Sequence, residues 1–378
     1  MTADRARDWR RELHRIPETA FGEHETGAYV AGVLRDLGFD VATGVGGTGV
    51  VGSLTRGSGR TVGLRSELDA LPISEESGVP YASRNPGAMH ACGHDGHMAM
   101  LLGAAAVLAE EGGFDGTVRA IFQPAEEPGR GAQAMVDDGL FARFPVDAVY
   151  GIHNIPGVPA GHLLTRTGPI MASEDNFTIR VTGRGGHASA PHLVVDPLVA
   201  GAEIVVALQQ VVARSVDPVR TAVLSCTDLR TDGARNAIPS HVTITGDTRS
   251  FDADVSELLE RRIREIAHGV ATAHGATAEV TYTREFAPTV NDADCVEVAG
   301  RAAARALGAD RVDTAAEPVM GSEDFGVLAR HVPACLAFLG NGTGPGDTPL
   351  HSHDYIFNDD ILAAGIAYYT EVVRDGAA

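Results

Sequence analysis

The segment Met89-His-Ala-Cys-Gly-His-Asp-Gly-His-Met98 gathers one cysteine, three histidines and one aspartate in a short stretch. The run behind it, residues 99–109, is rich in Ala, Leu and Met, which favour a helix. Cys92 is therefore expected on the turn that enters this helix, and His94 in its first turn. Because thiolates and imidazoles bind late divalent cations, the segment predicts half of a metal site. The alternative is ordinary surface polarity beside a buried thiol.

Three predicted strands end at further potential ligands. They cover residues 61–68, 116–122 and 148–152, and they deliver Asp69, the pair Glu126 and Glu127, and His153. A later loop, Pro349-Leu-His-Ser-His-Asp-Tyr355, adds His351 in front of a terminal helix predicted at 358–374. Open α/β sheets place their chemistry at the carboxyl ends of the strands, so these donors are expected to converge.

The adjacent carboxylates Glu126 and Glu127 predict a division of labour. Neighbouring side chains on an extended backbone point in opposite directions, so one can bind a cation while the other stays free to act as a base. Solvated surface acids are the alternative for this pair. Asp69 is expected either to orient a ligating histidine or to pair with Arg65.

Such a donor set suits two cations that share a bridging ligand and a water molecule. The cations would lower the pKa of that water and polarise a carbonyl oxygen, which predicts metal-assisted hydrolysis. The thiolate and imidazoles favour zinc, with manganese, cobalt or nickel as alternatives.

Composition narrows the function further. A chain of 378 residues, 44% of them hydrophobic, is expected to form two domains. The net charge of -20 argues against binding to nucleic acid or an anionic membrane, and no apolar run is expected to reach the length of a membrane span.

The 30 residues counted as Lys plus Arg are all Arg, so no lysine can anchor a Schiff base or a Walker-type phosphate site. No targeting signal is visible near residue 1, so a cytoplasmic location is expected.

The glycine-rich stretch Gly44-Val-Gly-Gly-Thr-Gly49 fits the dinucleotide-binding pattern only formally. Residues 50–54 continue as a strand where that fold requires a helix. A hairpin is expected here, and nucleotide binding is not.

The sequence changes character near Ser173. Residues 175–181, 196–214, 221–227, 241–247, 255–274 and 276–283 read as strand, helix, strand, strand, helix and strand, which is the ferredoxin-like order. We expect a mixed-sheet α/β domain formed by residues 1–172 and 286–378. A ferredoxin-like α+β domain, residues 173–285, is expected to be inserted into it.

Taken together, the motifs resemble those of the M20 metallopeptidase and amidohydrolase family, in particular the branch of hippurate, N-acyl-amino-acid and auxin-conjugate amidohydrolases. The resemblance covers nearly the whole length. It is carried by Asp69-Ala-Leu-Pro72, Met89-His-Ala-Cys-Gly-His-Asp95, Gln123-Pro-Ala-Glu-Glu127, Gly151-Ile-His-Asn154, Gly183-Arg-Gly-Gly-His187, Asn236-Ala-Ile-Pro239, Met320-Gly-Ser-Glu-Asp-Phe325 and Leu350-His351. Several independent motifs in the family order make it specific.

The resemblance implies a catalytic metallo-hydrolase domain with an inserted lid and dimerisation domain. It implies two divalent ions per subunit, held by Cys92, His94, Glu127, His153 and His351. Glu126 would activate the bridging water and protonate the leaving amine. His187 and Asn236 would face the scissile carbonyl, either within one chain or across a dimer, and Arg249 would bind a substrate carboxylate. A hydrogen-bonded loop histidine and a surface ion pair are the alternatives for His187 and Arg249.

The implied function is metal-dependent hydrolysis of the amide bond of N-acyl amino acids or related small amides, by a homodimer or larger homo-oligomer. A dipeptidase or aminopeptidase of the same family is one alternative, and a non-catalytic metal- or amino-acid-binding protein is another. His353 could replace His351 as the last ligand. The roles of Glu67, which stands where this branch more often has Asp, and of Glu323 are not assigned.

Overall fold

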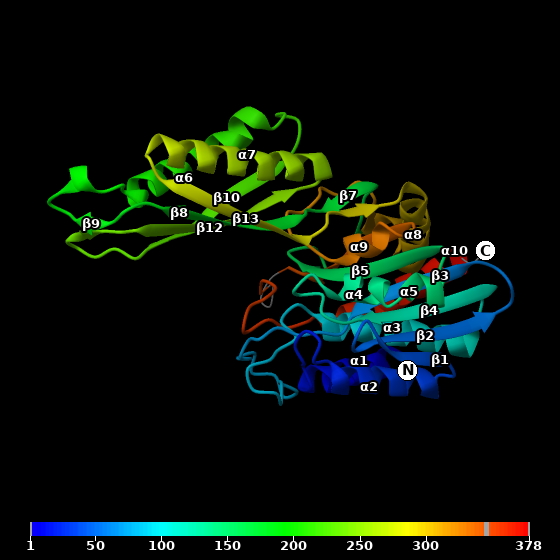
Figure 1. Cartoon of the computed structure of the whole chain (residues 1–378). Helices are drawn as coiled ribbons and strands as arrows, with labels where there is room; N and C mark the ends of the chain where they lie inside the picture. The colour runs from blue at the N-terminus through cyan, green and yellow to red at the C-terminus, as the bar shows by residue number, and fades with distance from the viewer. Residues whose placement is uncertain (1, 344–347, 377–378) are drawn as a thin grey trace. The chain divides into compact units, whose positions relative to one another are not determined.

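The computed structural model of the chain describes residues 2–343 and 348–376 (Figure 1). These residues form two compact units. The first unit comprises Met1–Ile170, Thr289–Pro318 and Glu323–Ala378, and the second comprises Met171–Pro288 and Val319–Ser322. The four residues Val319–Ser322 therefore pack with the second unit, although the sequence analysis assigned them to the larger domain.

The first unit is built on an eight-stranded sheet with the order β1-β2-β4-β3-β5-β16-β6-β15. The strands are β1 (Asp40–Val45), β2 (Gly49–Arg56), β3 (Thr61–Glu67), β4 (Gly116–Gln123), β5 (Ala148–Pro156), β6 (Leu163–Leu164), β15 (Val312–Asp313) and β16 (Ala334–Gly342). The central strands β4, β3, β5 and β16 run parallel, whereas β1 and β2 add antiparallel pairs at one edge. The predicted mixed-sheet α/β fold is confirmed.

The central strands have the sequence of strands that are covered on both faces. In β16 the run Ala-Cys-Leu-Ala-Phe-Leu-Gly is continuously buried, as expected for a parallel strand with structure on either side. Because these four strands are parallel, their carboxyl ends lie along one edge of the sheet. That edge carries the residues that follow Glu67 and Gln123.

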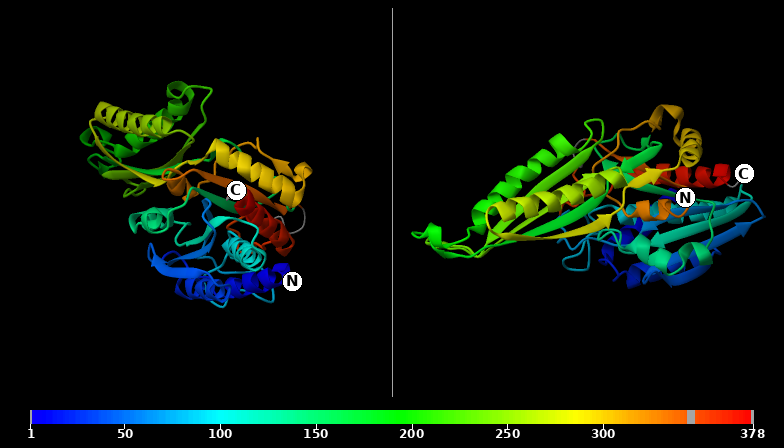
Figure 2. Two further views of the ribbon diagram at one scale, coloured as in Figure 1. Left: turned by 90° about the vertical axis from the view of Figure 1, so that its right-hand side faces the viewer. Right: turned by 45° about the horizontal axis from the view of Figure 1, so that its top comes forward.

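Five longer helices belong to the first unit: α1 (Thr2–Arg15), α2 (His24–Asp36), α3 (His94–Glu111), α8 (Ala293–Leu307) and α10 (Leu362–Gly376). Helix α3 is buried along most of its length and packs against α1, α10 and β3. Figure 2 shows α10, coloured red, beside α8 and α3. A helix that is apolar on all sides is typical of the interior of a domain.

The stretch Gly44–Gly49 connects β1 to β2 as an antiparallel hairpin, so that prediction is confirmed. Further along the chain, α4 (Gly131–Asp137) and α5 (Leu140–Arg143) are separated at Gly139, whose φ is 81°. A residue in this left-handed region ends a helix.

The second unit contains a four-stranded antiparallel sheet with the order β10-β12-β8-β13. Its elements follow one another as β8 (Glu174–Thr182), α6 (Pro197–Ser215), β10 (Ala222–Thr231), β12 (His241–Ser250), α7 (Ala253–Ala273) and β13 (Thr277–Phe286). Both helices contribute to one hydrophobic core with the sheet. The short strands β9 (Gly186–His187) and β11 (Ala237–Ile238) form a separate pair.

Within the described residues, α6 is the one helix that is long and apolar enough to cross a membrane. The expectation that no apolar segment is long enough to span a membrane is therefore wrong for α6, judged by its length and composition. Its residues Ala200, Ile204, Leu208 and Val211 are buried in the core of the second unit. A core helix passes the same test, so the composition of α6 is weak evidence for a membrane.

Candidate metal centre

The start of α3 places Cys92 and His94, both buried, at the carboxyl edge of the central strands. Between them, Gly93 adopts a φ of 90°, a conformation that glycine accepts without steric cost. A Cβ atom at this position would lie 2.4 Å from Asn154 Oδ1. Glycine is therefore required for the tight turn that brings the two donors together.

Cys92 lies at the centre of the donor cluster. Its Sγ is 3.4 Å from His153 Nε2 and 3.4 Å from His351 Nε2. His351 Nε2 is in turn 3.5 Å from Glu127 Oε2. In the described residues, five groups of side chains place their ligand atoms within 4.8 Å of one another, and three of them belong to this cluster: Cys92 with His94 and His153, Cys92 with Glu127 and His351, and His94 with Glu126 and Glu127. The first two groups share the Cys92 sulfur.

The orientation of the imidazoles fits a cation at this position. His94 Nδ1 is 2.8 Å from the backbone oxygen of Asp69, and His153 Nδ1 is 2.7 Å from that of Asn154. Each Nδ1 therefore carries the proton, which leaves the Nε2 lone pair available. Within the described residues, His94 Nε2 and Glu127 Oε1 are buried without a hydrogen-bond partner. Such unpaired acceptors are costly unless something positive binds them.

The electrostatics of the cluster point the same way. Burial, with the charge of Glu127, raises the pKa of the Cys92 thiol well above its usual value. Burial, with the charges of Glu323 and Glu127, raises the pKa of Glu126 well above its usual value. Burial also raises the pKa of Glu127 to about 7. A bound cation favours the deprotonated form of each group.

Asp69 contacts two residues of the donor cluster, His94 and Glu127. Its Oδ1 is 3.5 Å from His94 Nδ1, and its Oδ2 accepts a hydrogen bond from the Glu127 N–H at 3.0 Å. Arg65 instead pairs with three other carboxylates, so the orienting role is the better supported of the two alternatives for Asp69.

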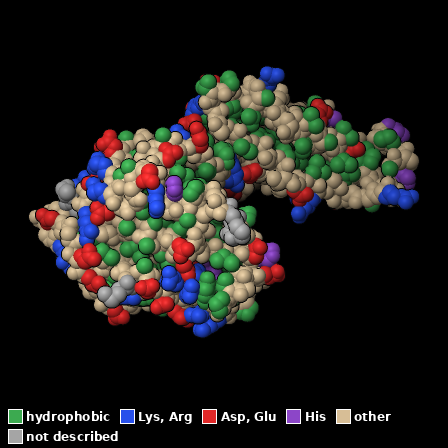
Figure 3. Space-filling view, turned by 180° about the vertical axis from the view of Figure 1, so that it is seen from behind, with side chains coloured by type: hydrophobic (Ala, Val, Ile, Leu, Met, Phe, Trp, Pro, Cys, Tyr) green, Lys and Arg blue, Asp and Glu red, His purple; other side chains and the backbone are tan. Residues whose placement is uncertain are grey.

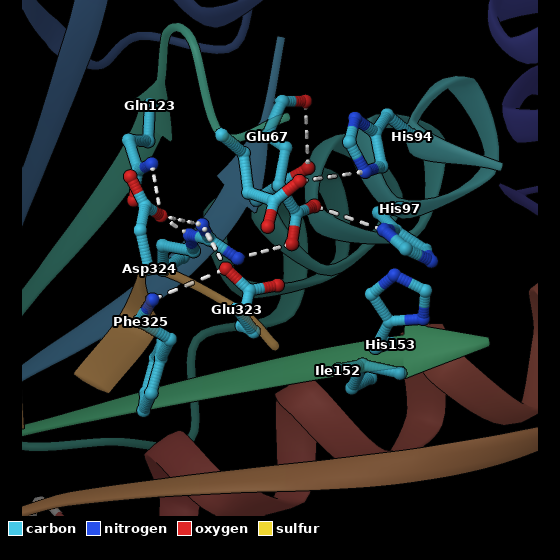
Figure 4. Close-up of polar contacts among 12 residues, drawn as sticks. Glu67, His94, His97, Gln123, Ile152, His153, Glu323, Asp324 and Phe325 are labelled. Carbon is cyan, nitrogen blue, oxygen red and sulfur yellow. Dashed lines mark hydrogen bonds and ion pairs between the residues drawn. The ribbon is translucent and has the colours of Figure 1, made fainter. Parts of the chain in front are cut away.

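Arg65 is fully buried between the strands and the segment that precedes α9 (Phe325–Ala329). Its Nη2 donates to Glu323 Oε1 at 2.8 Å and to Asp324 Oδ1 at 3.0 Å, and its Nη1 contacts Glu67. Gln123 completes the network, since it accepts from Arg65 Nε and donates to Asp324. Figure 4 shows Glu67, Gln123, Glu323 and Asp324 turned toward one another. Glu67 and Glu323 thus each form an ion pair with Arg65 in the interior of the first unit.

Sequence reasoning did not assign His97. Its Nδ1 is 2.9 Å from Glu67 Oε2, its Nε2 is 2.7 Å from Asn154 Oδ1, and its ring centroid is 4.8 Å from that of His153 (Figure 4). His97 therefore links the Arg65 network to a donor imidazole. The available signal was its spacing of three residues from His94, which places both side chains on one side of α3.

The structure separates His351 from His353. His351 lies beside Cys92 and Glu127, whereas His353 is exposed and its Nε2 is 3.5 Å from Glu76 Oε2. His351 has a φ of 65°, and Ala125, just before Glu126, has a φ of 47°. Left-handed conformations of residues other than glycine concentrate at functional sites, which agrees with the position of both residues.

The other predicted site residues lie in the second unit. His187 and Asn236 are neighbours, because β9 pairs with β11 and the Ala188 N–H donates to Asn236 O at 3.0 Å. This end of the unit also exposes Arg184, His192 and Arg235, and Figure 3 shows basic and histidine side chains gathered there. Arg249 lies near the end of β12, in the separate four-stranded sheet.

The chain is similar to known proteins in sequence and in fold. Residues 63–375 match the model of the family described as Peptidase family M20/M25/M40. The chain is 39% identical to hippurate hydrolase of Campylobacter jejuni, over 96% of this chain and 94% of the relative. It is 36% identical to N-acetyl-L-cysteine deacetylase of Bacillus subtilis, over 97% of this chain and 86% of the relative. Its fold is similar to that of a dinuclear metal-binding peptidase of the M20 family from Bacillus subtilis, with a TM-score of 0.87 and 30% sequence identity. The match covers 100% of this chain and 98% of that structure.

Proposed function

The chain belongs to peptidase family M20/M25/M40, and from this premise we propose that it hydrolyses the amide bond of N-acyl amino acids with the help of two divalent cations. Two relatives are named for such substrates, hippurate and N-acetyl-L-cysteine. The observation that carries the proposal is the shared sulfur of Cys92, which belongs to two donor groups at once. The two groups, Cys92 with His94 and His153 and Cys92 with Glu127 and His351, would hold the cations.

We assign Cys92, His94, Glu127, His153 and His351 as the residues that hold the cations. When bound, the cations lower the pKa of a water molecule and polarise the scissile carbonyl. The chain fixes its donors through the contacts of Asp69 with His94 and of Asn154 with His153. Zinc fits the mixture of sulfur, nitrogen and oxygen ligands, with manganese, cobalt and nickel as alternatives.

Glu126 is the general base in this proposal. Its Oε2 lies 3.8 Å from His94 Nε2, next to the donor groups, and the residue is not needed to complete either group around Cys92. Glu126 takes a proton from the attacking water while the water oxygen bonds to the carbonyl carbon. It then delivers that proton to the leaving nitrogen as the C–N bond breaks. The products are a carboxylate and an amino acid.

The second unit is proposed to act as a lid and dimerisation domain. His187 Nδ1 accepts a hydrogen bond from the Ser189 N–H at 3.1 Å, so the proton of a neutral ring sits on Nε2. This N–H and the Asn236 side chain are proposed to donate to the substrate carbonyl oxygen. Arg249 remains the residue predicted to bind the substrate carboxylate. All three of its guanidinium nitrogens already donate hydrogen bonds within the chain.

A substrate panel tests the proposed activity. Protein loaded with zinc or manganese is expected to hydrolyse N-benzoylglycine and N-acetyl amino acids much faster than dipeptides with a free amine. The opposite preference would favour the dipeptidase or aminopeptidase alternative. Absence of turnover on either class, with full metal content shown by elemental analysis, would favour a binding protein and contradict the proposal.

A further inference from the structure

The carboxylate of Glu174 joins two distant parts of the second unit. Its Oε2 accepts hydrogen bonds from Arg249 Nη2 and from Ser322 Oγ, each at 2.7 Å. Arg249 also donates through Nη1 to the backbone oxygen of Met320 at 2.8 Å, and through Nε to Asp247 at 2.9 Å. Hydrogen bonds that involve a charged partner are among the stronger ones in proteins.

These contacts act on one short segment, Val319–Ser322. The Ala172 N–H adds hydrogen bonds to Gly321 O at 3.0 Å and to Val319 O at 3.2 Å. The segment is therefore held along its length by β8, by β12 and by the residues that enter β8. This explains why it packs with the second unit although the chain on both sides belongs to the first.

The residues that follow the segment are Glu323 and Asp324, which pair with the buried Arg65 in the first unit. Ligand atoms of both acids lie within 4.8 Å of one another and of a Glu126 oxygen. Glu323 Oε2 is buried without a hydrogen-bond partner in the described part of the chain. Successive Cα atoms are about 3.8 Å apart, so the position of Ser322 restricts that of Glu323.

We propose that Glu174 and Arg249 are positioning residues that anchor Met320–Ser322 and thereby fix Glu323 and Asp324 beside the general base. This gives Arg249 a role that requires no substrate, in addition to the role predicted from the resemblance. Only the kinetic part of the test below rests on the proposed function.

Hydrogen exchange tests the anchor without any substrate. Glu174→Gln preserves the shape of the side chain but removes its charge, and Arg249→Met removes the donors. Both variants are expected to speed exchange of two amides by about tenfold or more, the loss expected for a hydrogen bond to a charged group. These are the Ala172 N–H, which donates to Gly321 O and Val319 O, and the Phe325 N–H, which donates to Glu323 Oε1. The matched control is Arg264→Met, since Arg264 also donates to a carboxylate, Glu260, and to a backbone oxygen, Val280 O, away from this segment. Unchanged exchange of the Ala172 and Phe325 amides in both test variants would overturn the proposal.

Kinetics separate the anchor from a purely substrate-binding role. An anchor predicts that both variants lower kcat on N-benzoylglycine and on its carboxamide alike. If Arg249 only binds the substrate carboxylate, Arg249→Met raises the KM for N-benzoylglycine but not for its carboxamide, and Glu174→Gln keeps the wild-type kcat. This pair of results would overturn the anchor. If the wild-type protein hydrolyses neither compound, the proposed function fails, while hydrogen exchange still decides the anchor.

Discussion

Glu126 and Glu127 are adjacent in the chain, yet they have different neighbours. Glu127 reaches His351 and is held through its N–H by Asp69, whereas Glu126 lies near Glu323 and Asp324. Adjacent carboxylates can therefore serve as ligand and base without exchanging roles. The extended backbone expected at this pair is wrong, because Glu126 and Glu127 lie in a turn where the Gly129 N–H donates to Glu126 O at 2.7 Å. The division of roles stays a prediction, now based on the different neighbours of the two carboxylates.

Replacing each glutamate by glutamine tests this division. Glu126→Gln is expected to keep its metal, measured by elemental analysis, and to lose about 10²- to 10⁴-fold in kcat, because a general base contributes that much. Glu127→Gln, the matched control, is expected to lose metal. A near-normal rate in Glu126→Gln would reject Glu126 as the base.

His14 makes a second residue-level prediction. Its ring lies 2.8 Å from Asp95 Oδ2 and 3.1 Å from Glu75 Oε1. Burial lowers the pKa of His14, but the Asp95 charge and hydrogen bond outweigh this effect and raise the pKa from 6.5 to about 9. The stabilisation is therefore fully present below pH 6.5 and is lost as the pH rises through about 9.

Urea unfolding of the wild type and of His14→Gln between pH 6 and 10 measures this effect. The difference in unfolding free energy is expected to shrink by about 3 kcal/mol as the pH rises through this window. Arg10 and Glu75, which also face this cluster, keep their charges over the range. A difference that stays constant with pH would contradict the assignment.

At this scale the sequence predicted the kinds of donor but not all of their partners. Cys92, His94, Glu127 and His153 could be proposed because each stands near the end of a predicted strand or the start of a predicted helix, whereas His351 was proposed from a loop. His351 and His353 could not be separated, since they flank one serine in a loop and only backbone geometry distinguishes them. Glu67 and Glu323 had no assignable role because their common partner, Arg65, is far from Glu323 in the sequence.

At the scale of elements, the turn into α3 depends on Gly93. Gly93→Ala is expected to destabilise the fold by about 1–3 kcal/mol, because the new Cβ would collide with Asn154 and the backbone would be strained. Gly269→Ala in α7 is the matched control, since a Cβ there meets nothing within 4 Å. That variant is expected to gain about 0.5–1 kcal/mol. Denaturation midpoints that move in the same direction would contradict this account.

The elements themselves were largely predictable, because apolar periodicity reports burial. The helices expected at 196–214 and 255–274 correspond to Pro197–Ser215 and Ala253–Ala273. The terminal helix expected at 358–374 is a 3₁₀ turn, Asp359–Ile361, followed by Leu362–Gly376. The placement of Val319–Ser322 could not be predicted, because it depends on side chains of Glu174 and Arg249 rather than on a local pattern.

At the scale of the whole molecule, the exposed face of α6 predicts self-association. Val199 and Val206, 54% and 72% exposed, lie two turns apart on that helix, so they share a face. We expect a second copy of the chain to cover this face, as the predicted dimer requires. The double substitution Val199→Asp with Val206→Asp is expected to yield monomers in light scattering coupled to size exclusion.

Val290→Asp in the first unit controls for added charge on an exposed valine, and it is expected to leave the mass unchanged. A wild-type protein that is monomeric at all concentrations would contradict the dimer. So would a double variant that keeps the mass of the wild-type assembly.

The most direct test of the central claim is a metal titration of the chelated protein. The account predicts that metal-free protein does not hydrolyse N-benzoylglycine and that activity returns with zinc or manganese until about two ions per chain are bound. It also predicts that Cys92→Ala weakens the binding of both ions, because both donor groups use its sulfur. Full turnover by protein shown to be free of metal would contradict the account.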